Sequence, residues 1–482
     1  MVHGIVSTVV ASPSPGHRLR LPTTFRWRLT LVTLAGLAIR VLYVMFVERG
    51  DPLSGDAVYY HEAANLLADG MGFIEPYRYL HGAAFEQLFV DDPGFLPTVA
   101  DPVMPVGHVE PTAGHPPLWV LVLAAFSSLG ISGILGHQLV SAATGAIVVA
   151  AIGWAGREVA GDRVGVIAAG LAALHAGLWL NDGLVMSESL TVVMVAALTG
   201  LAARLVRSPD RSTILALGAV GGLAALTRVE LLAFLPLAAL PVLRYRSLSH
   251  AGRWLRFVAV GLVALVVMSP WLIRNLSVFE EPVLLSNGSG ILIAQTNCDA
   301  TYFGDKQGYW EYLCALPQPV SGDGWLLDES ERDTRYRRRG LDFAADHPVR
   351  LITNAVPKRI GRLWGVYDPV GQLRADKLVE GRNFGLSVLG LVQYYTLLPM
   401  AVAGAVLLRR KGLPRLHLLA WPAIVTAVAA LTMGTTRYRV PAEVALVLLA
   451  AVALEAILDL SRRSRRAAST PPVEHPAPKL PR

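Results

Sequence analysis

Residues 257–273 read FVAVGLVALVVMSPWLI and contain no charged side chain, although Arg256 precedes them and Arg274 follows them. An uncharged apolar run bounded by arginines is typical of a helix that crosses a bilayer, which needs about 20 largely apolar residues. Of the 482 residues in the chain, 53% are hydrophobic and 16% are charged, whereas an ordinary soluble protein has about 25% charged residues. This composition argues against a soluble enzyme, a disordered chain and a disulfide-dense secreted module.

Nine further segments have a similar apolar composition, which predicts an all-α polytopic membrane protein with about ten transmembrane helices. Two of these segments are short and flank Thr227-Arg228-Val229-Glu230, which we interpret as a tight turn at the membrane edge. The predicted spans are 29–47, 134–155, 164–181, 184–203, 212–227, 229–243, 257–273, 386–408, 416–434 and 440–459.

One further apolar stretch, from Pro116 to Ile131, is only about 16 residues long, which suits an interfacial or re-entrant helix better than a span. Lys and Arg prefer the cytoplasmic side of a membrane, and this preference offers a separate test. If residues 115–131 do not cross and the N-terminus is inside, the Arg-rich connections fall in the cytoplasm. If they cross, every later basic connection lies outside. We therefore predict a juxtamembrane helix over 115–131.

This topology divides the chain into a few regions. Residues 1–28 form a basic cytoplasmic N-terminus without the apolar core of a secretory signal, 29–273 hold helices 1–7, 274–385 form an outer loop, 386–460 hold helices 8–10, and 461–482 form a basic, disordered cytoplasmic tail. The net charge of +7 therefore reports orientation and does not indicate a nucleic-acid partner.

Two long outer loops, residues 48–114 and 274–385, are the default place for function. The first loop is rich in acids. Within it, apolar spacing predicts a short amphipathic helix over Ala57–Asp69, with Gly70 as a plausible stop. Asp56 stands at the start of this helix, where it is either an N-cap or a catalytic acid, and the two roles are compatible.

Both cysteines, Cys298 and Cys314, fall in the second outer loop. An oxidising exterior favours a disulfide between them over two free thiols. Such a bridge would stabilise the local structure by about 3 kcal/mol in the chain-entropy model. A zinc site is disfavoured, because two cysteines without a nearby histidine pair leave ligands missing.

The second loop also contains an apolar helical stripe over residues 349–363, with Lys358, Arg359 and Arg362 on its other side. Two interpretations remain open. The helix lies at the membrane interface with snorkelling basic side chains, or the three cations form a phosphate clamp at the membrane surface.

Most polar residues within the predicted spans gather at their outer ends, namely Asp182, Glu188, Arg228, Glu230, Arg274, Arg437 and Arg439. A transporter would be expected to place ionisable groups near the bilayer midplane, on discontinuous helices. Acids and arginines at headgroup height instead suit a reaction on an anionic lipid, because arginine pairs with phosphate and a carboxylate can act as a general base. The chain has no Walker A, HExxH or GxSxG motif.

The ordered motifs of the chain resemble the GT-C superfamily of integral-membrane glycosyltransferases, on the branch with protein O-mannosyltransferases and the aminoarabinose transferase that modifies lipid A. The matching stretches are Gly55-Asp56-Ala-Val-Tyr59-Tyr60, Leu66-Leu67-Ala68-Asp69-Gly70-Met-Gly72-Phe73, His115-Pro116-Pro117-Leu118, Ser187-Glu188-Ser189-Leu190, Gly222-Leu223-Ala-Ala-Leu226-Thr227-Arg228, Pro270-Trp271-Leu-Ile-Arg274-Asn275 and Arg437-Tyr438-Arg439-Val-Pro441. Each motif is weak alone, but the ordered set is fairly specific for the superfamily.

The resemblance implies a GT-C-like bundle with extracytoplasmic juxtamembrane helices, in the cytoplasmic (inner) membrane of a bacterium such as an actinobacterium. It implies a polyprenyl-phosphate sugar as donor, with Asp56 as the acid that deprotonates the acceptor hydroxyl and Asp182 or Glu188 as a second acid lining the cavity. Acceptor or sugar contacts are assigned to Tyr59, Tyr60 and His115, and the donor phosphate to Arg228, Arg274, Lys358, Arg359, Arg362, Arg437 and Arg439.

One departure concerns the acceptor. No clear Asp-Glu pair stands at Asp56, which weakens the case for a protein acceptor, and an envelope glycan or lipid acceptor stays open. Membrane lipids surround the protein in any case. The sequence identifies no definite cofactor: acids in the first loop could hold a divalent cation, but no ligand spacing demands one. The alternative functions are a transporter or flippase for a lipid or lipid-linked sugar, and a silent membrane scaffold.

Overall fold

The computed structural model describes residues 24–82, 106–245, 247–319, 321 and 327–469. The predicted N-terminal segment, the middle of the first outer loop and the end of the tail therefore lie largely outside the described residues. Within them, regular structure is helical, apart from one isolated bridge between Ile74 and Pro111.

The first half of the chain holds eleven of the described α-helices. They are α1 (Phe25–Tyr43, continued by a π-helical turn Val44–Glu48), α2 (Asp56–Ala68), α3 (Pro76–His81), α4 (Leu118–Ser127), α5 (Ile134–Ala160), α6 (Asp162–Leu174), α7 (Ala176–Trp179), α8 (Glu188–Arg207), α9 (Arg211–Ala225), α10 (Phe234–Ala239) and α11 (His250–Val278).

The second half holds the remaining outer loop and the last long helices. They are α12 (Ser289–Thr296), α13 (Asp299–Tyr302), α14 (Glu329–Asp346), α15 (Pro348–Arg350), α16 (Val356–Leu363), α17 (Pro369–Glu380), α18 (Phe384–Arg410), α19 (Leu416–Leu431) and α20 (Val440–Ser469).

Six of the described helices are long and apolar enough to cross a membrane: Phe25–Glu48, Ile134–Ala160, Glu188–Arg207, His250–Val278, Phe384–Arg410 and Thr436–Arg465. A seventh span arises if Asp162–Leu174 and Ala176–Gly183 count as one helix bent by 65°. The chain is thus an all-helical, multi-pass membrane protein.

The predicted count of about ten spans exceeds this number for a local reason. Helices α9 and α19 are apolar but short, and the predicted span 229–243 is divided into 3-10, α and 3-10 turns. Pro236 and Pro241 lie in this region, and proline removes the backbone donor that a continuous helix needs. Helix α4, inside the predicted 115–131 segment, has ten residues and is shorter than a span.

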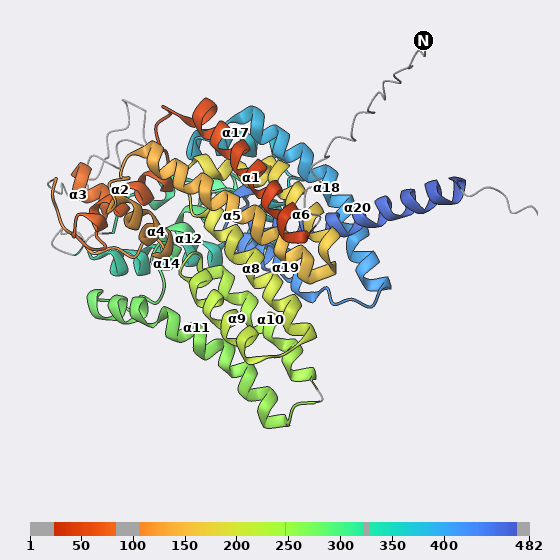
Figure 1. The fold of residues 1–482 in the computed structure, drawn as a ribbon. Helices are drawn as coiled ribbons and strands as arrows, with labels where there is room; N and C mark the ends of the chain where they lie inside the picture. The colour runs from red at the N-terminus through yellow and green to blue at the C-terminus, as the bar shows by residue number, and fades with distance from the viewer. Residues whose placement is uncertain (1–23, 83–105, 246, 320, 322–326, 470–482) are drawn as a thin grey trace, which may run out of the picture.

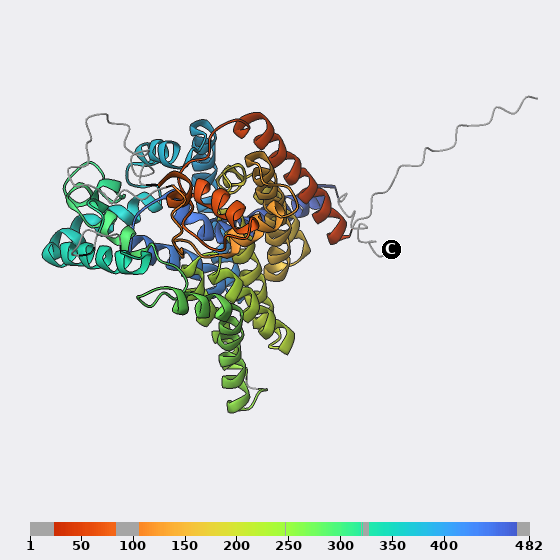
Figure 2. The ribbon, with the colours of Figure 1, turned by 90° about the vertical axis from the view of Figure 1, so that its left-hand side faces the viewer.

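The bundle core is built by close helix contacts (Figure 1). Helix α5 packs against α1, α6 and α8, and α18 packs against α20. Glycines allow the closest approaches: a Cβ on Gly165 of α6 would lie 2.6 Å from the carbonyl oxygen of Gly153 on α5. Small residues at such crossings are the usual way in which membrane helices approach one another. Helices α9 and α11 extend away from the rest of the bundle (Figures 1 and 2).

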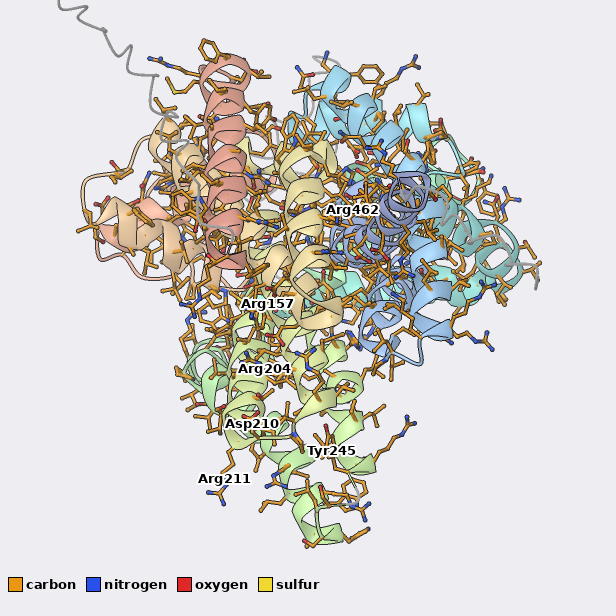
Figure 3. The ribbon with its side chains drawn as sticks, turned by 45° about the vertical axis from the view of Figure 1, so that its right-hand side comes forward. Arg157, Arg204, Asp210, Arg211, Tyr245 and Arg462 are labelled. Carbon is orange, nitrogen blue, oxygen red and sulfur yellow. A yellow bond between two sulfur atoms is a disulfide. The ribbon has the colours of Figure 1, made fainter. Side chains whose placement is uncertain are left out.

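Several connections predicted to be cytoplasmic lie together. Arg204 Nη2 at the end of α8 lies 3.2 Å from Glu158 Oε1 at the end of α5, and Arg157 pairs with Asp162 at 2.8 Å. The Asp210 side chain caps α9 by accepting a hydrogen bond from the Thr213 backbone. Figure 3 shows Arg157, Arg204 and Asp210 on this part of the molecule. The connection that follows α5 thus starts beside the end of α8.

The two outer loops contact each other. The Glu110 carboxylate of the first loop lies 2.7 Å from Arg332 on α14, and the Ala113 backbone donates to Glu329 at 3.0 Å. The predicted disulfide between Cys298 and Cys314 is present and closes part of the second loop. Residues 110–113 of the first loop therefore pack against the start of α14 in the second loop.

Candidate functional site

Helix α2 presents Asp56 as its first residue. The preceding Gly55 is the N-cap, with φ of +56°, a conformation that favours glycine. A Cβ at Gly55 would lie 2.9 Å from the Val379 carbonyl oxygen. No side chain caps this helix, so the interpretation of Asp56 as an N-cap is wrong: its carboxylate points elsewhere because the cap position is taken by the glycine.

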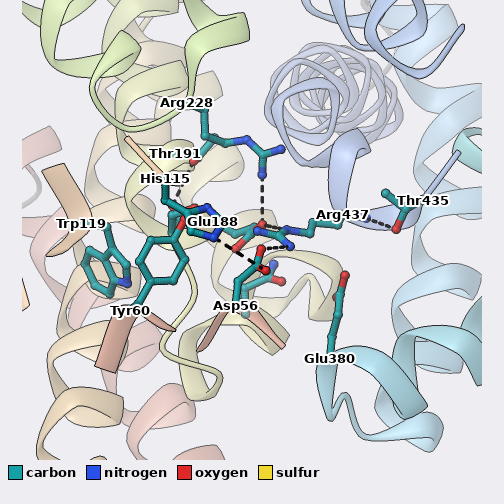
Figure 4. A network of polar contacts seen from close by, with 12 residues as sticks. Asp56, Tyr60, His115, Trp119, Glu188, Thr191, Arg228, Glu380, Thr435 and Arg437 are labelled. Atoms are coloured by element: carbon teal, nitrogen blue, oxygen red, sulfur yellow. Dashed lines mark hydrogen bonds and ion pairs between the residues drawn. The ribbon is translucent and has the colours of Figure 1, made fainter. Parts of the chain in front are cut away.

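Arg437 is the residue toward which that carboxylate points (Figure 4). It lies in the 3-10 turn Thr436–Arg439, just before α20. Its Nη1 lies 2.6 Å from Asp56 Oδ2, and its Nε donates to Oε1 of Glu188, the first residue of α8. The helix starts of α2, α8 and α20 thus bring one arginine and two acids together from distant parts of the sequence.

Burial differs sharply within this group. The Glu188 side chain is fully buried, Arg437 is 13% exposed and Asp56 is 34% exposed. Glu188 also accepts from Arg228 Nη1 at 3.0 Å, and Arg228 in turn pairs with Glu230 at 2.6 Å. One buried carboxylate therefore anchors two arginines, while Asp56 keeps a path to solvent.

An aromatic and imidazole wall stands beside Asp56. His115 Nε2 lies 3.8 Å from Asp56 Oδ1, and the Tyr60 hydroxyl lies 3.4 Å from His115 Nδ1. Tyr60 also donates to Ser187 at 3.3 Å. The Tyr59 hydroxyl instead contacts Thr112. Of the three predicted contact residues, His115 and Tyr60 thus face the acid, and Tyr59 packs behind them.

The electrostatics of the site keep Asp56 ionised. Burial raises the pKa of Asp56, but the charges of Arg437 and His115 outweigh it and lower the pKa to about 2. Burial lowers the pKa of His115, which favours the neutral imidazole. As it stands, the paired carboxylate is a weak base.

The segment before Glu188 is held in a strained conformation. Val185 has φ of +58°, which is unfavourable for a β-branched residue, and its carbonyl accepts a hydrogen bond from Trp119 Nε1 at 2.9 Å. Trp119 lies on α4 and is fully buried. The juxtamembrane helix therefore fixes the turn that leads to Ser187 and Glu188, a role that the sequence did not reveal.

Other predicted site residues lie apart from Arg437. Asp182 pairs with Arg40 at 2.5 Å, with both side chains buried. Arg274 donates to the backbone carbonyls of Thr112 and Phe73, each at 2.9 Å. These two predicted residues join structural elements, and no contact between them and Asp56 or Arg437 is present among the described residues.

Arg439 belongs to a separate buried cluster. It lies 2.8 Å from Glu443, which also contacts His175 at 2.8 Å, and its guanidinium stacks on Tyr394. His175 stands at the bend between α6 and α7, so this cluster holds two helices of the bundle together.

The cations of the second-loop helix also have protein partners. Arg359 is 2% exposed and donates to the Thr296 carbonyl at 2.5 Å. Arg362 donates to the Gln307 carbonyl at 2.8 Å, and Lys358 donates to the Gln307 side chain. The two buried arginines do not snorkel to the surface, because backbone carbonyls satisfy them inside the fold.

Glu380 and Arg382 are residues of the site region that sequence reasoning missed. They pair at 2.6 Å, and Arg382 donates to Asn181 at 2.9 Å. Burial raises the pKa of Glu380 to about 7 even with Arg382 beside it. Figure 4 shows Glu380 near Arg437. The one sequence feature that could have indicated them is the pair of opposite charges on either side of Gly381, at the end of the second loop.

No group of three or more His, Cys, Asp or Glu side chains among the described residues is arranged to hold a metal ion.

Part of the chain is similar in sequence to a known protein family. Residues 114–273 match the sequence model of the dolichyl-phosphate-mannose-protein mannosyltransferases. This region contains His115, Glu188 and Arg228, whereas Asp56 and Arg437 lie outside it. No protein with a curated function matches the chain.

Solved structures share the fold. The oligosaccharyltransferase of Archaeoglobus fulgidus in its apo form is 14% identical over 92% of this chain and 52% of its own, with a TM-score of 0.52. The same enzyme tethered to an acceptor peptide with the NVT sequon is 15% identical over 92% and 51%, with a TM-score of 0.50. This chain therefore spans about half the length of that enzyme.

ArnT from Cupriavidus metallidurans bound to undecaprenyl phosphate is 17% identical over 93% of this chain and 82% of its own, with a TM-score of 0.37, too low to argue from. The family match over residues 114–273 agrees with the resemblance to membrane glycosyltransferases, and the archaeal enzyme shares the fold of this chain.

Proposed function

We propose that this protein transfers a sugar from a polyprenyl-phosphate donor to an acceptor hydroxyl, at the extracytoplasmic face of the bacterial cytoplasmic membrane. The single observation that carries the proposal is the contact between the partly exposed Asp56 and Arg437, at the ends of the helices. A base and a phosphate-binding cation lie side by side there.

The cations suit a phosphate. Arg437 and Arg228 approach the same carboxylate, so two guanidinium groups share one buried charge. A planar guanidinium pairs with phosphate through two parallel hydrogen bonds. Glu188 would hold both arginines in place while the donor binds.

The reaction follows from these positions. Asp56 accepts the proton of the acceptor hydroxyl as its oxygen forms a bond to the anomeric carbon of the sugar. The bond from that carbon to the phosphate oxygen breaks, and polyprenyl phosphate leaves with its negative charge against Arg437. Attack opposite to the leaving group inverts the configuration. General-base help contributes about 10²–10⁴ in rate.

The membrane topology belongs to the same proposal. The short apolar helices α9 and α19 and the divided segment 229–243 would bring the seven long or bent helices to about ten spans. With both termini in the cytoplasm, the Asp56 loop then lies outside, because the Arg-rich connections lie inside. The short helix α4 would rest at the outer surface beside the site, with its N-terminal end carrying His115.

A panel of labelled polyprenyl-phosphate sugars tests the function. We expect the purified full chain to consume one donor and release polyprenyl phosphate in the presence of membrane extract as acceptor. A matching nucleotide sugar serves as the control and should not be consumed. Movement of intact donor across a vesicle bilayer without release of polyprenyl phosphate would favour a transporter and contradict the proposal.

A further inference from the structure

Two of the three nitrogens of the Arg437 guanidinium hold carboxylates. Nη1 is bonded to Asp56 and Nε to Glu188. A guanidinium has five N–H donors in a fixed fork, and its strongest contacts with phosphate use two of them in parallel. The parallel pairs are Nη2 with Nη1 and Nη2 with Nε, so a phosphate that takes either pair approaches a nitrogen that already holds a carboxylate.

Glu188 is the carboxylate that stays. It is fully buried at the start of α8 and is also bonded to Arg228 at 3.0 Å. Moving it away from Arg437 would weaken the neutralisation of a buried charge, which is costly. A helix N-terminus further stabilises a negative charge.

Asp56 is the carboxylate that can leave. A third of its side chain is exposed, so water can replace the arginine. Other groups also act on it or respond to it. His115 lies 3.8 Å away, the charge of Arg228 lowers the pKa of Asp56 at longer range, and the charge of Asp56 raises the pKa of the Tyr60 hydroxyl. Its ion pair with Arg437 is therefore the weaker of the two.

We propose that the donor phosphate and Asp56 compete for Nη1 of Arg437, so that donor binding releases the base for the acceptor hydroxyl. This inference rests on the proposed function. Released from the guanidinium, Asp56 loses the charge that keeps its pKa low and becomes a stronger base. The base is active only when the donor is loaded, which implies that donor binds before acceptor.

Binding of undecaprenyl phosphate, without any sugar, tests the competition. We expect Asp56→Asn to bind this lipid about tenfold or more tightly than the wild type in nanodiscs, because the amide competes less for the guanidinium than a carboxylate does. A variant that merely damaged the site would bind more weakly. The wild type should prefer undecaprenyl phosphate to neutral undecaprenol.

Asp51→Asn is the matched control. Asp51 is an exposed acid of the same loop, and its substitution removes the same charge. It should leave binding unchanged at physiological salt, where separated surface charges are screened. If both variants bind undecaprenyl phosphate more tightly by the same factor, the cause is long-range repulsion and the proposed exchange is wrong.

The remaining outcomes separate the two proposals. If wild type and Asp56→Asn bind undecaprenyl phosphate equally, and both better than undecaprenol, the exchange is wrong and the proposed function stands. If neither protein distinguishes the phosphate from the neutral alcohol, the proposed donor class itself is wrong.

Discussion

Two arginine–aspartate pairs in this protein have nearly the same geometry and different surroundings. Arg437 approaches Asp56 to 2.6 Å, and Arg40 approaches Asp182 to 2.5 Å. The Asp56 side chain is 34% exposed, whereas that of Asp182 is 1% exposed and also accepts from Ser189. Solvent therefore reaches the first pair, for which we propose an exchange with a ligand, whereas the second pair is buried and joins α1 to the turn that precedes α8.

The largest expected effect comes from breaking the exposed pair. Asp56→Asn should lose transfer by about 10²–10⁴, the usual contribution of a general base, while the protein inserts and purifies normally. Initial rates with the consumed donor measure this loss, and the size-exclusion profile measures folding. Transfer within a few-fold of wild type would remove Asp56 from the role of base.

Breaking the buried pair should change stability instead. Asp182→Asn leaves Arg40 without its counter-charge, which costs about 3–5 kcal/mol in buried pairs and should lower the thermal unfolding temperature. The double substitution Arg40→Leu with Asp182→Leu should recover much of this loss, because an apolar pair needs no counter-charge. An Asp182→Asn protein of full stability with poor donor turnover would show that Asp182 acts in the reaction.

The smallest expected effect is a pH dependence of stability that arises from two buried acids, Glu75 and Glu329. Burial raises the pKa of Glu75 to about 7 and that of Glu329 to about 8, and the charges of neighbouring carboxylates add to the shift. Arg78 and Arg332 form their ion pairs with Glu110. The folded state then binds more protons than the unfolded state above pH 4.5, so stability should fall as pH rises toward 8.

Melting temperatures between pH 5 and 9 measure this slope. Glu329→Gln should flatten it, since the amide does not titrate. A slope that is unchanged in the variant would place the titrating group elsewhere.

The sequence predicted the local elements well where the pattern was periodic. The helix expected over Ala57–Asp69 is found over Asp56–Ala68, and the span 257–273 lies within α11. The disulfide was predicted from two facts: both cysteines lie in one loop, and that loop is expected on the oxidising side of the membrane. Such features depend on neighbouring residues, so a single sequence contains the information.

Pairing between distant residues was beyond the sequence. Arg274, Arg437 and Arg439 all looked like phosphate ligands, because each stands at an outer helix end. In the structure, Arg274 donates to backbone carbonyls and Arg439 pairs with Glu443. Of the three, only Arg437 pairs with Asp56. Which arginine meets which acid depends on how helices far apart in sequence cross, and periodicity carries no such information.

Gly55 also connects the two loops. Its backbone lies so close to the Val379 carbonyl that no larger residue fits, and Ser54 donates to the same oxygen. Val379 directly precedes Glu380 at the end of α17. This contact, together with those of Glu110 and Ala113, joins the loop that carries Asp56 to the loop that carries Glu380, so a side chain at position 55 should displace both acids.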